Sequence, residues 1–166
     1  MTNETIDLEQ LQSEIEGQKT FDDLQQLWRK VEDQFGRDRA KRKEYALMFR
    51  SAGEKIFERT RNFEKRYLVF KSLSRDPFRL KDKQWEKGLR LRILEEAKTF
   101  EEVMDIYDSN GSHCGDVVAF LEKAGTLASS VNEHWLVATK AKNCSEDLWI
   151  KEIKKIHELL SVLGKI

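Results

Sequence analysis

The chain has 166 residues, of which 36% are charged, with one proline, eight glycines and no net charge. This composition excludes an extensive sheet or a long disordered linker, and it predicts an all-α protein with one core. No apolar run approaches the length of a membrane span, and the first residues lack a basic start before an apolar segment. We therefore expect a cytoplasmic protein without membrane association, in which Cys114 and Cys144 are thiols.

The charges are unevenly distributed along the chain. Residues 1–16 carry five acids and no base, residues 17–97 carry 22 bases against 14 acids, and residues 98–166 carry 8 bases against 11 acids. A basic middle segment between acidic ends gives information about binding partners or contacts within the chain, and not about the fold.

The N-terminal residues 1–18 form an acidic segment that we interpret as a capping helix or tail. Over residues 5–16, Leu8, Leu11 and Ile15 share one side of a helix that Gly17 would stop. The remaining residues, 19–166, are predicted to form a single helical-repeat domain.

A repeated motif opens the segments of this domain. The segment 98–107 reads KTFEEVMDIY and the segment 19–28 reads KTFDDLQQLW, and weaker copies begin at Asn62 and Ser130. The copies begin at positions 20, 62, 99 and 130, which lie 42, 37 and 31 residues apart. Spacings of this size are typical of stacked helical hairpins.

Each clear copy has the pattern of a capping box, a hydroxyl residue followed by an acid three positions later: Thr20 and Asp23, Thr99 and Glu102, Ser130 and Glu133. Apolar residues follow the cap at helical spacing, which predicts one buried stripe for each helix. The copy at Asn62 has Lys65 in place of the acid, so residues 52–73 fit either one long helix or two in line.

The sequence predicts eight or nine helices and no strand. Helices are expected from Thr20 to Phe35, from Arg37 to Arg50, from a cap at Ser51 onward, from Pro77 to Ala97, after Thr99, from Val117 to Gly125, from Ser130 to Lys142 and from Ser145 to Gly164. The tryptophans, which all lie on helical stripes, are predicted core anchors: Trp28, Trp85, Trp135 and Trp149.

The segment Ala97–Glu102 with Ile106, Tyr107, Gly111 and Ser112 resembles a unit of bacterial helical-hairpin repeat proteins, broadly similar to the tetratricopeptide and HEAT classes. The match covers mainly residues 97–126. It lacks the Trp-x-x-Leu-Gly signature and the constant period of the tetratricopeptide class. The fourfold pattern of caps and stripes predicts an α-solenoid-like stack of about four hairpins with an N-terminal capping helix. The resemblance implies a scaffold that binds other macromolecules along a concave face.

Common catalytic signatures are absent from the sequence, including the phosphate-binding glycine loops, the H-E-x-x-H zinc motif and the G-x-S-x-G nucleophile motif. We therefore predict no catalytic residue, no cofactor and no metal. The alternative is a zinc site formed by His113, Cys114, His134 and Cys144, whose spacing matches no common zinc motif.

Two basic clusters form the candidate binding surface: Arg37, Arg39, Lys41, Arg42 and Lys43 in the first, and Arg75, Arg79, Lys81, Lys83, Lys87 and Arg90 in the second. A solvated helix face is the plainer explanation of such runs. Our expectation is a non-enzymatic adaptor or scaffold for protein–protein interaction, because acids are interspersed with the bases. The alternative is a nucleic-acid-binding protein that uses a basic face from residues 37–43 and 75–92.

Overall fold

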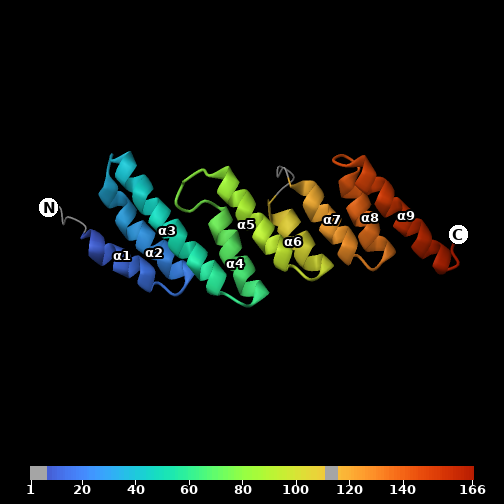
Figure 1. Ribbon diagram of the computed structural model, residues 1–166, viewed down its shortest axis with the longest axis horizontal. Coiled ribbons are helices and arrows are strands. Elements are labelled where there is room, and N and C mark those ends of the chain that lie inside the picture. Colours follow the sequence, from blue (N-terminus) through green and yellow to red (C-terminus); the bar gives the residue numbers. More distant parts are fainter. Residues whose placement is uncertain (1–6, 111–115) are drawn as a thin grey trace. The chain divides into compact units, whose positions relative to one another are not determined.

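The structure, a computed structural model, describes residues 7–110 and 116–166. Within these ranges it contains nine α-helices, one 3₁₀ helix and no strand, which confirms the all-α prediction (Figure 1). No helix in the described part of the chain combines the length and the apolar character needed to cross a bilayer. The helices group into two compact units, Met1–Leu89 and Arg90–Ile166, and the boundary falls inside α5 (Lys83–Glu96).

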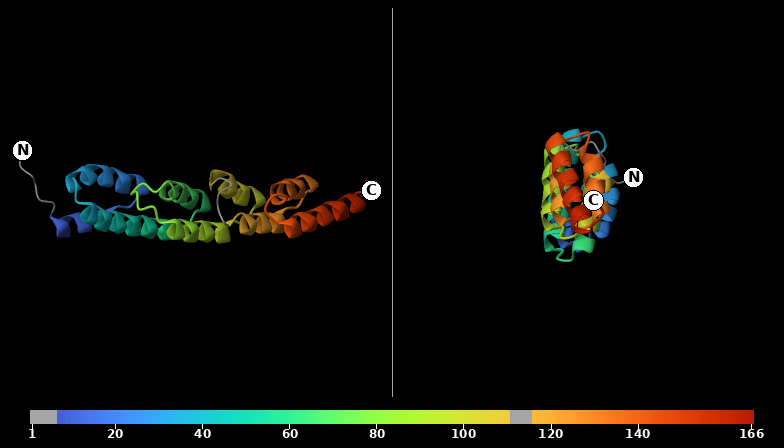
Figure 2. Two further views of the ribbon diagram at one scale, coloured as in Figure 1. Left: turned by 90° about the horizontal axis from the view of Figure 1, so that it is seen from above. Right: turned by 90° about the vertical axis from the view of Figure 1, so that its right-hand side faces the viewer.

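Unit 1 contains, besides the start of α5, the elements α1 (Leu8–Gly17), α2 (Phe21–Val31), η1 (Glu32–Phe35), α3 (Arg39–Arg59) and α4 (Phe63–Ser74). The helices α1 and α3 lie in one layer, and α2 and α4 lie in the other (Figure 2). An aromatic cluster fills the space between the layers, because the ring of Phe78 lies 5.6 Å from Trp28, 5.8 Å from Phe49 and 6.3 Å from Phe21.

The predicted break after Arg50 is wrong. Helix α3 runs without interruption from Arg39 to Arg59, and Ser51 lies inside it. Gly53, close to the predicted cap, lies in the same helix and allows close packing, since a Cβ at this position would lie 2.9 Å from Leu73 Cδ2 and 3.0 Å from Phe21 Cε2. The chain breaks instead before α4, so residues 52–73 belong to two helices.

The predicted helix start at Pro77 is also wrong. Residues 75–82 form a loop, and α5 begins at Lys83, where Asp82 Oδ1 accepts a hydrogen bond from the Trp85 amide at 3.1 Å. Phe78 is 1% exposed because it enters the aromatic cluster of unit 1. The local signal at Pro77 favours a helix start. Burial of the Phe78 ring against α2 and α3 is more favourable, so the chain stays in a loop at this point.

Unit 2 contains, besides the end of α5, the helices α6 (Phe100–Asn110), α7 (Val117–Leu127), α8 (Val131–Ala141) and α9 (Glu146–Val162). Within this unit α6 and α8 lie in one layer, and α7 and α9 lie in the other (Figure 2). Fully buried apolar residues from three of these helices form its core: Val103, Ile106, Leu121, Ala124, Val137 and Ala141.

The predicted repeat openings are helix starts in the structure, at α2, α4, α6 and α8. The capping box of α8 is complete, because Ser130 Oγ accepts from the Glu133 amide at 3.2 Å and Glu133 Oε2 accepts from the Ser130 amide at 3.0 Å. Asn62 caps α4 by accepting from the Lys65 amide at 3.1 Å. The stacking of these helices into a solenoid and the single domain over 19–166 stay predictions.

The prediction that all four tryptophans are core anchors is wrong for one of them. Trp28 is buried, and Trp85 and Trp149 are half-buried, but Trp135 is 59% exposed. The buried side of α8 is formed by His134, Val137, Ala138 and Ala141. Trp135 follows His134 directly, and a step of one residue turns the side chain by about 100° around the helix axis, away from the core.

Candidate interaction surfaces

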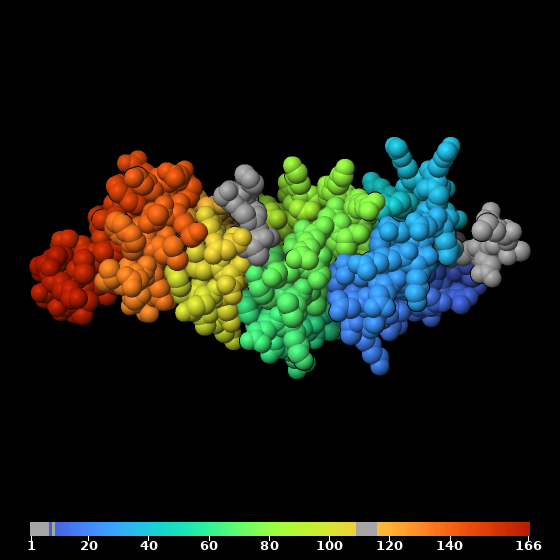
Figure 3. All heavy atoms as spheres, turned by 180° about the vertical axis from the view of Figure 1, so that it is seen from behind, coloured from blue at the N-terminus to red at the C-terminus, as the bar shows by residue number. Residues whose placement is uncertain are grey.

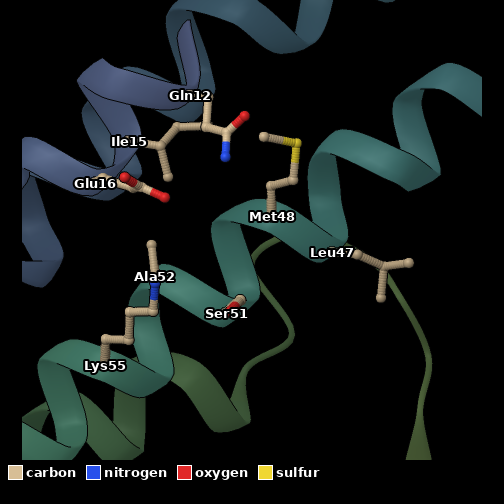
Figure 4. A pocket seen from close by; sticks show the side chains of 8 residues that line it. All are labelled: Gln12, Ile15, Glu16, Leu47, Met48, Ser51, Ala52 and Lys55. Carbon is tan, nitrogen blue, oxygen red and sulfur yellow. The ribbon is translucent and has the colours of Figure 1, made fainter. Parts of the chain in front are cut away.

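A groove with a volume of about 300 Å³ lies between α1 and α3 in unit 1. Its lining residues come from both helices: Gln12, Ile15 and Glu16 from α1, and Leu47, Met48, Ser51, Ala52 and Lys55 from α3 (Figure 4). In the close view Met48 points toward α1, whereas Leu47 points away from it. The small side chains of Ser51 and Ala52 leave the space between the helices open.

The groove combines an apolar floor with charges of opposite sign. Ile15 and Ala52 are buried and Met48 is half-buried, so the floor is apolar. Glu16 on α1 and Lys55 on α3 are exposed and flank it from its two walls. An apolar depression with a charged rim is suited to hold an apolar side chain whose neighbours carry charges.

The predicted basic residues are mostly solvent-accessible. Nine of the eleven are exposed, while Arg42 and Arg90 are half-buried. Arg42 is held in place, because its guanidinium carbon lies 5.2 Å from the Trp28 ring centroid and its Nη2 lies 3.6 Å from Glu32 Oε2. Arg90 is the first residue of unit 2.

Trp28 contacts both of the segments that carry the basic clusters in unit 1. One of its contacts is the Arg42 guanidinium from the first cluster, and another is the Phe78 ring, which directly precedes Arg79 of the second cluster. The cyan segment where α3 begins and the yellow-green segment where α5 begins lie along the same edge of unit 1, each with long side chains standing out into solvent (Figure 3). Nothing in the sequence pattern indicates that Trp28 contacts both Arg42 and Phe78.

The loop between α4 and α5 holds three residues in the left-handed region: Asp76 at φ 49°, Arg79 at φ 56° and Lys81 at φ 54°. Side chains other than glycine adopt this conformation at a cost of about 1–2 kcal/mol per residue. Asp76 stabilises the loop, because its carboxylate accepts hydrogen bonds of 2.8 Å from the amides of Leu80 and Lys81. Buried Phe78 anchors the loop to the core.

The end of the loop is attached to α3 by Asp82. Its Oδ2 accepts from Arg50 Nη1 at 2.8 Å, and the hydrogen bond to Arg50 is the main reason why the pKa of Asp82 lies below its usual range. The Arg50 guanidinium also lies 4.9 Å from the Trp85 ring centroid, and Trp85 Nε1 donates to Glu54 Oε1 at 2.5 Å. The loop is therefore fixed to α3 at both Phe78 and Asp82.

Unit 2 contains a buried charged cluster that the sequence analysis missed. Glu152 is fully buried in α9, and its Oε2 lies 2.5 Å from Nδ1 of His134, which is itself buried in α8. Lys155 Nζ donates to Glu152 Oε1 at 3.0 Å and to the carbonyl oxygen of Gly125 at 2.8 Å. These contacts join α7, α8 and α9.

Gly125 makes room for this carboxylate. A Cβ at Gly125 would lie 2.5 Å from Glu152 Oε1, well inside a normal contact. The acid has its hydrogen-bonding partners within the protein, which is the usual condition for a charge inside a core. We interpret the cluster as structural. Its only sequence signal is an acid between the apolar residues Leu148 and Ile156 at helical spacing.

The zinc alternative can be followed only at two of its four residues. His113 and Cys114 lie outside the described residues. His134 contacts Glu152, and Cys144 is exposed, with its Sγ 3.6 Å from the carbonyl oxygen of Lys140. Among the described residues no group of three or more potential ligands is placed to hold a metal ion.

Comparison with known proteins gave no match to this chain among protein-family models, curated proteins or solved structures.

Proposed function

We propose that this chain is a non-enzymatic, cytoplasmic adaptor that binds a partner protein through the groove between α1 and α3. The observation that carries this proposal is the apolar floor of Ile15, Met48 and Ala52 below an open, charged rim. The resemblance of the repeat motif to helical-hairpin scaffolds favours the same function.

The occupant that fits the groove best is an amphipathic helix of the partner. Both walls are helices, and the small residues Ser51 and Ala52 let a third helix approach closely. An apolar anchor would enter the floor while flanking charges meet Glu16 and Lys55. The groove volume of about 300 Å³ lies at the lower limit for small-molecule pockets, which are usually more enclosed.

The test is affinity capture from a nuclease-treated native cell extract with the wild type and with Ser51→Arg. Ser51 is exposed inside α3, and arginine favours a helix more than serine does, so the variant should fold normally. Its longer side chain would fill the groove. We expect a defined protein to bind the wild type and to be lost from the variant.

The matched control is Ser161→Arg, the same substitution at an exposed helical position of α9. It should retain the partner. Recovery of the same protein on Ser51→Arg at the wild-type level would contradict the proposal, as would the absence of any defined protein after nuclease treatment. Circular dichroism of both variants checks that their helical content is unchanged.

A further inference from the structure

We infer that unit 1 carries a second site, separate from the α1–α3 groove, which binds the phosphate backbone of a nucleic acid duplex. We call this site the basic edge and define it by six exposed residues: Arg37, Arg39, Lys41, Lys43, Arg79 and Lys81. None of them lines the groove, so the inference does not rest on the proposed protein-binding function.

The six residues come from two segments that the core holds together. Arg42 and Phe78 both contact Trp28, and Phe78 also contacts Phe49 of α3. The starts of α3 and α5 lie along the same edge of unit 1, and long side chains stand out from both segments into solvent (Figure 3).

The positive charge of the basic edge is available to a ligand. None of its six side chains forms an ion pair with another residue in the described part of unit 1. The same segments carry four acids, Asp38, Glu44, Asp76 and Asp82, of which Asp82 is paired with Arg50. The bases of the edge therefore outnumber the acids that remain.

The loop presents its two basic residues in a fixed conformation. Residues 78 to 81 alternate in exposure. Phe78 is buried and Leu80 is half-buried, whereas Arg79 and Lys81 are exposed. Both have a left-handed backbone, in which glycine would be more favourable. Two long basic side chains at strained backbone positions do not favour folding. Their presence in an anchored loop is better explained by a role in binding.

Recognition at the basic edge should depend on the backbone of a duplex and not on its bases. Proteins that bind single strands stack the bases on exposed aromatic rings. The exposed large apolar residues described in unit 1 are Leu47 and Leu68, and neither is aromatic. Contacts with phosphates alone carry no sequence information. We therefore assign the site to duplexes of any sequence.

The experiment measures binding of the full chain to a short DNA duplex of mixed sequence at several salt concentrations. The variant is Arg79→Gly with Lys81→Gly, which removes two charges at positions where glycine relieves the strained backbone. Loss of affinity in this variant cannot then be attributed to unfolding, and urea denaturation should show stability that is equal or higher. If each residue contacts one phosphate, the slope of log K against log[salt] should become less steep by about 1.8.

The control, Lys151→Ala with Lys154→Ala, removes the same charge from two exposed positions of α9 and should leave the slope unchanged. Three comparison ligands are a single strand of the same length, polyglutamate and phosphatidylserine-containing vesicles. Binding to any of these as tight as to the duplex overturns the assignment. So does an unchanged slope in the glycine variant, an equal loss in the control, or no duplex binding at low salt.

Discussion

Replacing Gly125 by alanine sets two physical effects of opposite sign against each other. Within a helix the change from glycine to alanine normally stabilises by about 0.5–1 kcal/mol. At Gly125, however, the new Cβ would lie 2.5 Å from Glu152 Oε1. The carboxylate cannot simply turn away, because it is fully buried and bonded to His134 and Lys155.

The magnitude follows from the hydrogen bonds of this carboxylate. Moving Glu152 weakens at least one hydrogen bond to a buried charged group, which is worth about 1.5–3 kcal/mol. After subtraction of the helix term, we expect the free energy of unfolding to fall by about 0.5–2.5 kcal/mol. Gly88, which lies inside α5, is the control, since a Cβ at this position would have no other atom within 4 Å. Gly88→Ala should stabilise by about 0.5–1 kcal/mol.

Urea denaturation followed by circular dichroism measures these differences, and hydrogen exchange assigns the effect to α7–α9. A double-mutant cycle adds a sharper test. In a Glu152→Ala background the obstacle is gone, so Gly125→Ala should become stabilising. If Gly125→Ala stabilises the wild type as much as Gly88→Ala does, the account of the buried carboxylate is wrong.

Further predictions concern caps, the core and acid sensitivity. Thr99→Ala should lower the free energy of unfolding by about 1 kcal/mol through the capping box, and Phe100→Ala by about 3–5 kcal/mol through the core; chemical denaturation giving the reverse order would contradict both assignments. Phe78→Ala should cost about 3–5 kcal/mol by the same measurement, whereas a change near zero would mean that the loop is not anchored. The lowered pKa of Asp82 stabilises the fold above the pKa of the unfolded carboxyl, and this stabilisation is lost as the pH falls through the folded pKa. Asp82→Asn should therefore be less stable than the wild type near neutral pH and equal to it in strong acid, as urea titrations across pH would show.

The helix starts at the repeat copies were predictable from the sequence because caps are local. The amide of Asp23 reaches Thr20 at 3.2 Å and that of Glu102 reaches Thr99 at 3.1 Å, three residues apart in each pair. Such bonds depend on backbone geometry that a short segment forms by itself. The all-α class and the four repeat openings follow from the same local signals.

Helix interiors and loops were predicted less well where distant residues decide. Ser51 has the local appearance of a helix cap, yet it lies inside α3, where Phe21 and Leu73 pack close to the backbone of Gly53. Asp76 and Pro77 have the local appearance of a helix start. Phe78 packs in the aromatic cluster instead, and the helix begins at Lys83. In both cases burial of a large side chain outweighs a backbone preference.

In the candidate surfaces, too, some features were predictable from local sequence and others depended on distant contacts. The basic residues were identifiable from the sequence, since charge runs are visible without a fold, but the packing of their two segments against Trp28 depends on the tertiary structure of α2, α3 and the loop. The position of Glu152 between Leu148 and Ile156 is the only sign of its burial in the sequence, because its contact with His134 and the space left for it at Gly125 involve two other helices. Sequence by itself determined the interactions that span three or four residues, whereas tertiary structure decided those between side chains far apart in the chain, whose energies depend on which helices share a core.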